Sequence, residues 1–140
     1  MVKPKKILLV EDNSDDALLT HRALQKTEIS VLIDIAKDGA EAIEYLYHIC
    51  YSSLTVPDLI ILDLNLPKVD GFEVLKKIRS EIKTKAVPVI ILTSSREKKD
   101  IRLAAEYGAN SYIQKPVDFV KFKEVADLIG KYWLGVNESV

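Results

Sequence analysis

The chain has 140 residues and a formal net charge of −1, which is enough for one domain with a buried core and too little for two. Its 20 Lys and Arg residues and 21 Asp and Glu residues nearly balance, so no basic stripe predicts nucleic-acid binding. Cys50 is the only cysteine, which excludes an intrachain disulfide and a cysteine metal cluster and makes a cytoplasmic setting the expectation.

The first apolar run is short and ends in acidic residues. Residues 7–10 are all apolar and predict a buried strand, but the run is too short for a signal peptide or a membrane span. A helix is expected over residues 14–26. Acidic side chains favour the start of a helix, which is our interpretation of Asp15 and Asp16. Glu11 and Asp12 precede the helix and need another explanation.

A second strand is expected at residues 31–36, followed by a helix that begins near Gly39. We interpret residues 47–56 as a long connection, to which no role is assigned. Asp63 then follows four apolar residues in a segment bounded by prolines, which predicts a strand buried on both faces. Ligands bind at the carboxyl ends of parallel strands, so Asp63 is best explained by chemistry. The alternative is that Asp63 caps a turn.

The second half of the chain repeats the alternation of strand and helix. Strands at residues 87–92 and 110–114 deliver Thr93 and Lys115. Three helices are expected, the middle one over residues 98–107. Their inward-facing residues, taken from three- and four-residue spacings, are Val74, Leu75, Ile78 and Ile82, then Ile101, Ala104 and Ala105, and last Phe119, Phe122, Val125, Ile129 and Trp133.

Five alternations of strand and helix predict an α/β fold, a flavodoxin-like doubly wound parallel sheet of five strands in the order 2-1-3-4-5 with five helices. We expect one domain over residues 1–140, with its core at about 5–133. In this order the first and third strands are neighbours, so the carboxylates of Glu11, Asp12 and Asp63 should converge. Thr93 and Lys115 should lie at the same edge.

Three crowded carboxylates repel one another, each pair by about 1 to 4 kcal/mol. A hard divalent cation would relieve this repulsion, and Mg²⁺ suits carboxylate ligands combined with phosphate oxygens. An aspartate can attack phosphorus to form an aspartyl phosphate. The cation and Lys115 would then neutralise the phosphoryl charge, and the Thr93 hydroxyl could donate a hydrogen bond.

This set of strand-end residues resembles the receiver domain of two-component response regulators, from Lys5 to about Trp133. The resemblance implies phosphorelay signal transduction, in which a sensor histidine kinase transfers a phosphoryl group from a phosphohistidine to Asp63. The protein would promote its own phosphorylation and dephosphorylation and would not be an enzyme acting on an external substrate. The residues that carry the resemblance are Glu11, Asp12, Asp63, Thr93, Lys115 and Pro116.

The resemblance also implies a Mg²⁺ site. Glu11, Asp12 and Asp63 would bind the ion together with the backbone carbonyl of Asn65. Asn65 and Ser95 would flank the attacking water and tune hydrolysis of the aspartyl phosphate.

A conformational switch is implied as well. Thr93 would turn inward to the phosphoryl group, and Tyr112 would follow it as an aromatic switch. Lys115 would contact the phosphate, and its peptide bond to Pro116 would be cis.

Within the family, the chain looks similar to single-domain regulators that partner bacterial phytochrome kinases. The similarity lies in residues 63–68, the 47–56 connection and the 131–134 tail. Output would then pass through a protein partner or a homodimer, with neither nucleic acid nor membrane involved. The expected surface comprises helix 4, strand 5 and helix 5, where Tyr132 and Trp133 leave aromatic area to cover. The alternative for Trp133 is the last core position of helix 5.

Three other functions fit parts of the pattern. A haloacid dehalogenase phosphatase needs a second aspartate where Asn65 stands. A flavodoxin needs a phosphate loop where the acidic residues 11–16 would repel the phosphate. A receiver fold that acts as an interaction module without phosphorylation stays open as the main alternative.

Overall fold

The computed structural model describes residues 4–26, 30–52 and 54–136. No helix in these ranges is both long and apolar enough to cross a membrane. The strands are β1 (Lys5–Val10), β2 (Val31–Ala36), β3 (Leu59–Leu62), β4 (Val89–Thr93) and β5 (Ser111–Gln114). The helices are α1 (Ser14–Gln25), α2 (Gly39–Tyr51), α3 (Gly71–Ser80), α4 (Lys98–Glu106) and α5 (Phe119–Gly130), and α5 continues into a π-helical segment, η1 (Lys131–Val136).

The five strands form one parallel sheet in the order β2-β1-β3-β4-β5, which confirms the predicted topology. Val10 is in register with Leu62, and Leu62 with Ile91, so β1 and β3 end level and β4 runs two residues further, to Thr93. Residues that follow these strands therefore emerge side by side at one edge.

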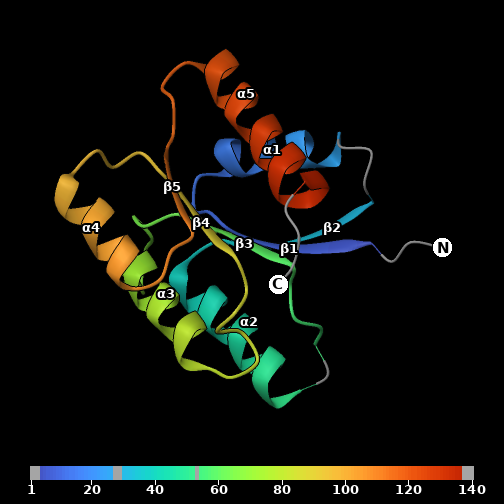
Figure 1. Cartoon of the computed structure of the whole chain (residues 1–140), viewed down its shortest axis with the longest axis vertical. Coiled ribbons are helices and arrows are strands. Elements are labelled where there is room, and N and C mark those ends of the chain that lie inside the picture. The colour runs from blue at the N-terminus through green and yellow to red at the C-terminus, as the bar shows by residue number, and fades with distance from the viewer. Residues whose placement is uncertain (1–3, 27–29, 53, 137–140) are drawn as a thin grey trace.

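Helices cover both faces of the sheet (Figure 1). Helices α1 and α5 lie on one face, and α2, α3 and α4 lie on the other. Strand β1 shows the alternation: Ile7 and Leu9 join the core beneath α1 and α5, whereas Leu8 and Val10 join the core beneath α2 and α3. All four side chains are buried, which is why the strand reads as a continuous apolar run.

Helix α2 is longer than expected. It runs to Tyr51, so half of the expected 47–56 connection is helical. The reason is that Ile49 continues the inward stripe of Ala42 and Leu46, and all three are at most 1% exposed. Tyr47 and Tyr51 lie on the outer side, with their ring centroids 4.9 Å apart.

Three of the predicted inward stripes were partly wrong. Helix α3 ends at Ser80, so Ile82 lies beyond it and is 85% exposed. Helix α4 lies at the periphery of the sheet and buries Ala104, whereas Ile101 and Ala105 are exposed. Phe119, at the first turn of α5, is also exposed.

The end of the α5 stripe follows the prediction more closely. Trp133 is half-buried and packs against the core beneath α1 and α5, as the alternative reading of this residue expected. Tyr132 is about half exposed and contacts Trp133 edge to face. Aromatic area therefore remains at the surface beside η1.

Arg79, at the last turn of α3, forms hydrogen bonds with both segments that enter β4 and β5. Its guanidinium donates to the carbonyl oxygens of Val87 at 2.7 Å and Gly108 at 2.9 Å, and to Asn110 Oδ1 at 2.9 Å. A weaker bond reaches the carbonyl of Lys85 at 3.1 Å. Asn110 Oδ1 also accepts from the Val89 backbone N–H, so the start of β4 depends on the same group.

We expect Arg79→Gln to lower the free energy of unfolding by about 2 to 3 kcal/mol, because partly buried carbonyl groups lose a charged donor. Urea denaturation measures this loss. Arg102→Gln, on an exposed position of α4, is the control and should change stability by less than about 0.5 kcal/mol. Equal stabilities of the two variants would contradict the anchoring role.

Candidate functional site

The strand ends bring Glu11 and Asp63 together. The Asp63 backbone N–H donates to the Val10 carbonyl at 3.0 Å, and the Glu11 N–H donates to the Ala36 carbonyl at 3.0 Å. These bonds extend the parallel ladder one residue past the strands and fix both acidic residues at the sheet edge. Glu11 is 3% and Asp63 5% exposed, so two carboxylates are buried side by side.

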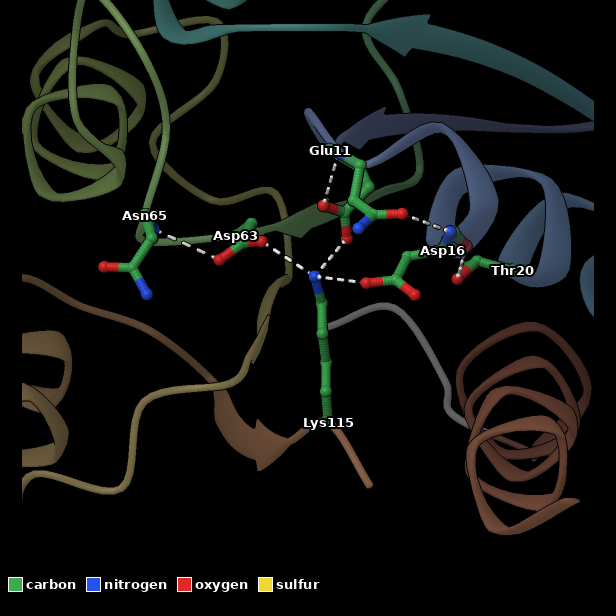
Figure 2. A network of polar contacts seen from close by, with 7 residues as sticks. Glu11, Asp16, Thr20, Asp63, Asn65 and Lys115 are labelled. Carbon is green, nitrogen blue, oxygen red and sulfur yellow. Dashed lines mark hydrogen bonds and ion pairs between the residues drawn. The ribbon is translucent and has the colours of Figure 1, made fainter. Parts of the chain in front are cut away.

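Lys115 enters this acidic site from the end of β5. Its backbone N–H donates to the Thr93 carbonyl at 2.7 Å. Its Nζ lies 2.6 Å from Glu11 Oε1, 2.8 Å from Asp63 Oδ2 and 3.1 Å from Asp16 Oδ2 (Figure 2). An ammonium group has three N–H donors, so three carboxylates satisfy it completely.

Asp16 is the site residue that the sequence analysis missed, since its position near a helix start was explained by the helix dipole. Its carboxylate instead faces Lys115, from the first turn of α1 (Figure 2). Asp16 follows Asp12 by four residues, a spacing that places two side chains on one face when both residues are helical. The helix begins only at Ser14, so this spacing does not predict that Asp16 lies beside the site.

The electrostatics of the site follow from burial. Burial raises the pKa of Glu11 to about 7, with the charge of Asp63 adding to the rise and Lys115 opposing it. Burial alone would lower the pKa of Lys115, but hydrogen bonds and charge from Asp63 and Glu11 outweigh this effect and raise the pKa above its ordinary value. Lys115 is therefore a firmly charged cation in an acidic site.

Three carboxylates form a group suited to a metal ion. Ligand atoms of Glu11, Asp12 and Asp63 all lie within 4.8 Å of one another, and Asp12 is exposed at the mouth of the site. Such oxygen donors fit a hard divalent cation such as Mg²⁺, which keeps several waters. Among the described residues one ammonium group, that of Lys115, pairs with this acidic cluster, so the charge balance also favours an added cation.

Hydrogen bonds and a close contact at Gly71 fix the conformation of the loop after β3. The Asn65 backbone N–H donates to Asp63 Oδ1 at 3.1 Å, so Asp63 also caps a turn, as the alternative interpretation expected. Gly71 N–H donates to the Leu64 carbonyl at 2.9 Å, and a Cβ on Gly71 would lie 2.3 Å from the Asp63 carbonyl oxygen. Only glycine permits this close approach, which positions Asp63 against the start of α3.

Thr93, Ser95 and Tyr112 lie on the other side of the site. Thr93 is fully buried, and among the described residues its Oγ1 has no hydrogen-bond partner. The Tyr112 hydroxyl donates to the Ser95 carbonyl at 3.1 Å, and the Ser95 hydroxyl donates to Asp100 Oδ2 at 2.6 Å. The β4–α4 loop is thus bonded to β5 and α4, while the Thr93 hydroxyl beside it lacks an acceptor.

The expected cis bond between Lys115 and Pro116 is wrong, because no described peptide bond is cis. The trans form is favoured at most X-Pro bonds by about 0.5 to 1 kcal/mol. In the trans arrangement the Lys115 ammonium already reaches Glu11, Asp16 and Asp63, so the observed contacts do not require a cis bond.

This arrangement, with acidic residues after β1 and β3 and a lysine after β5, belongs to a known class of protein. Residues 7–127 match the family model of the response regulator receiver domain, and the chain belongs to this family.

Two relatives illustrate its place in the family. The probable methanogenesis regulatory protein FilR2 of Methanothrix harundinacea is 41% identical over 133 residues, covering 95% of this chain and 86% of FilR2. Response regulator Rcp1 of Synechocystis is 36% identical over 132 residues, covering 94% of this chain and 90% of Rcp1.

Solved structures are similar over nearly the whole chain. The phosphorylated cyanobacterial phytochrome response regulator RcpA superposes with a TM-score of 0.92 at 37% identity, covering 97% of this chain and 98% of RcpA. The Mn²⁺-bound form of Rcp1 superposes with a TM-score of 0.91 at 33% identity, covering 98% of this chain and 99% of Rcp1.

We expect Mg²⁺ to raise the melting temperature of the protein, because the cation relieves repulsion within the carboxylate group and binds only the folded state. Asp12→Asn should reduce this shift. Without Mg²⁺ the same variant should be as stable as the parent or up to about 1 kcal/mol more stable, because one crowded charge is gone. Thermal melts at matched ionic strength measure both effects. Equal Mg²⁺ shifts in the parent and in Asp12→Asn would contradict the assignment.

Proposed function

We propose that this protein is a response regulator whose Asp63 accepts a phosphoryl group from the phosphohistidine of a sensor histidine kinase. One observation carries the proposal. The buried Asp63 carboxylate belongs to the acidic group suited to Mg²⁺ and also pairs with the Lys115 ammonium, which is 2.8 Å from Asp63 Oδ2. Positive charges on both sides of the nucleophile stabilise the transition state of its attack on an anionic phosphoryl group.

The chemistry is a transfer between nitrogen and oxygen. An Asp63 carboxylate oxygen forms the new O–P bond while the N–P bond of the phosphohistidine breaks and its electron pair stays with the imidazole. When bound by Glu11, Asp12, Asp63 and the Asn65 carbonyl, Mg²⁺ would supply charge neutralisation for the phosphoryl oxygens. Lys115 holds a second positive charge at the acceptor oxygen.

The proposal includes a switch in the loop after β4. A phosphoryl group adds about −1.5 to −2 of charge and new acceptor oxygens next to β4. The Thr93 hydroxyl is a buried donor with no acceptor in the part of the chain that the structure describes, so it gains one if it turns to the phosphoryl group. Because Tyr112 bonds to the Ser95 carbonyl in the same loop, a shift of the loop also changes the position of Tyr112.

The surface that responds is formed by α4, β5 and α5. Strand β5 lies at the edge of the sheet. Apolar area is exposed on α5 and η1, at Phe119, Leu128 and Tyr132. Phosphorylation would bias this face toward the arrangement that binds a protein partner or a second copy of the chain. We propose a phytochrome-type kinase as the first candidate donor, because the cyanobacterial phytochrome response regulator RcpA is similar over almost the full chain.

Acetyl phosphate with Mg²⁺ should add one phosphoryl group to the protein, as read by intact mass. Asp63→Asn should abolish the addition, because it removes the nucleophile. Asp15→Asn is a matched control on an exposed position near the site and should be phosphorylated normally. Omission of Mg²⁺ should slow the reaction by at least about tenfold.

If the folded protein takes up no phosphoryl group from acetyl phosphate or from a phosphorylated histidine kinase, the phosphoacceptor function is wrong. The constitutive interaction module would then be the better description. Addition that survives in Asp63→Asn would place the acceptor elsewhere in the chain.

We expect Thr93→Val to keep the phosphoryl group on Asp63 but to lose the response of the β4–α4 loop. Valine has a similar shape and removes an unpartnered buried hydroxyl, so the free energy of unfolding should stay the same or rise by up to about 1 kcal/mol. Hydrogen exchange of residues 94–97 measures the response.

Thr93→Ser retains the hydroxyl and should respond to phosphorylation as the parent does. A phosphorylation-dependent change in exchange that persists in Thr93→Val would separate the loop from the Thr93 hydroxyl and overturn the switch mechanism.

A further inference from the structure

Asp16 differs from the other two carboxylates that bind Lys115. Glu11 and Asp63 each pair with the Lys115 ammonium and also belong to the candidate metal group. Asp16 pairs with the same ammonium at 3.1 Å, but it lies outside that group, on the first turn of α1. Of the three carboxylates that pair with Lys115, Asp16 is therefore the one that is not also a candidate metal ligand.

A divalent cation and Lys115 compete for Glu11 and Asp63. A carboxylate oxygen that coordinates a metal has fewer lone pairs to offer, and the two positive charges repel each other. The Lys115 side chain is only 8% exposed, so its ammonium group cannot turn to bulk water without leaving the site. Loss of all acceptors by a buried charge is strongly unfavourable.

The Asp16 carboxylate is held beside Lys115, where it can accept from the ammonium group if a cation takes Glu11 and Asp63. The Asp16 backbone N–H donates to Asn13 Oδ1 at 3.0 Å, and the Asp16 carbonyl accepts from Thr20 Oγ1 at 2.8 Å. These two bonds fix the start of α1. Figure 2 shows the Asp16 side chain pointing at Lys115 Nζ from the side opposite Asp63.

We propose that Asp16 is a positioning residue for Lys115. By holding the ammonium group, it frees Glu11 and Asp63 for a divalent cation and so raises the affinity of the site for Mg²⁺. The proposal rests on the Mg²⁺ step of the proposed function. Since Asp16 is not a ligand in this scheme, its effect depends on the presence of the Lys115 side chain.

Calorimetric titration of the full chain with Mg²⁺, at fixed pH and ionic strength, tests the proposal. Asp16→Asn should weaken Mg²⁺ binding about fivefold or more, because the ammonium returns to Glu11 and Asp63 and one negative charge is lost. Asp15→Asn removes the same charge from the same helical turn and should weaken binding less than about twofold. The hydrogen bonds of Asp16 at the helix start involve its backbone, so asparagine retains them, which circular dichroism checks.

A double-mutant cycle separates positioning from simple charge. In a Lys115→Met background, Asp16→Asn should weaken Mg²⁺ binding no more than Asp15→Asn does, because no ammonium remains to be held. An equal loss with and without Lys115 would overturn the proposal, since Asp16 would then act only through its charge.

The two hypotheses fail in different ways. If the parent protein binds Mg²⁺ and Asp16→Asn binds it equally well, the positioning role is wrong and the proposed function stands. If the parent does not bind Mg²⁺ at all, the metal step of the proposed function fails, and the role of Asp16 fails with it.

Discussion

One buried ammonium group holds the site together. Lys115 comes from the end of β5 and pairs with carboxylates that come from the end of β1, the end of β3 and the first turn of α1. Buried charges are stable only when they are paired, so the position of each of these segments depends on the others. A cation that binds Glu11 and Asp63 would therefore compete with Lys115 for their carboxylate oxygens.

The opposite side of the site is arranged differently. The Lys115 backbone bonds to the Thr93 carbonyl, but the Thr93 hydroxyl has no partner among the described residues. The loop that follows Thr93 is bonded to the edge of the sheet through Tyr112 and Ser95. On the acidic side Lys115 pairs with Glu11, Asp16 and Asp63, whereas the Thr93 side holds a donor that has no acceptor among the described residues. A new acceptor between the two sides would receive hydrogen bonds from both Lys115 and Thr93, which is the basis of the proposed link between Asp63 and the face of α4, β5 and α5.

The sequence predicted the topology and the convergence of the acidic residues well, for a physical reason. Continuous apolar runs such as residues 59–62 occur in strands buried on both faces, and parallel strands bring their carboxyl ends to one edge. The contact between Asp16 and Lys115 could not be predicted, because it depends on the course of a loop between strand and helix. The exposure of Ile101 likewise depends on how α4 packs against the sheet, which local spacing does not record.

The anchoring of Arg79 has a mechanical consequence. Its bonds to Val87, Gly108 and Asn110 clamp the two segments that enter β4 and β5, at the end of the sheet opposite the acidic site. The far ends of the same strands carry Thr93 and Lys115. Strands β4 and β5 are therefore anchored at their amino ends, and their carboxyl ends lead to the acidic site. If phosphorylation moves the β4–α4 and β5–α5 loops, the hydrogen bonds of Arg79 would restrain the opposite ends of the same two strands.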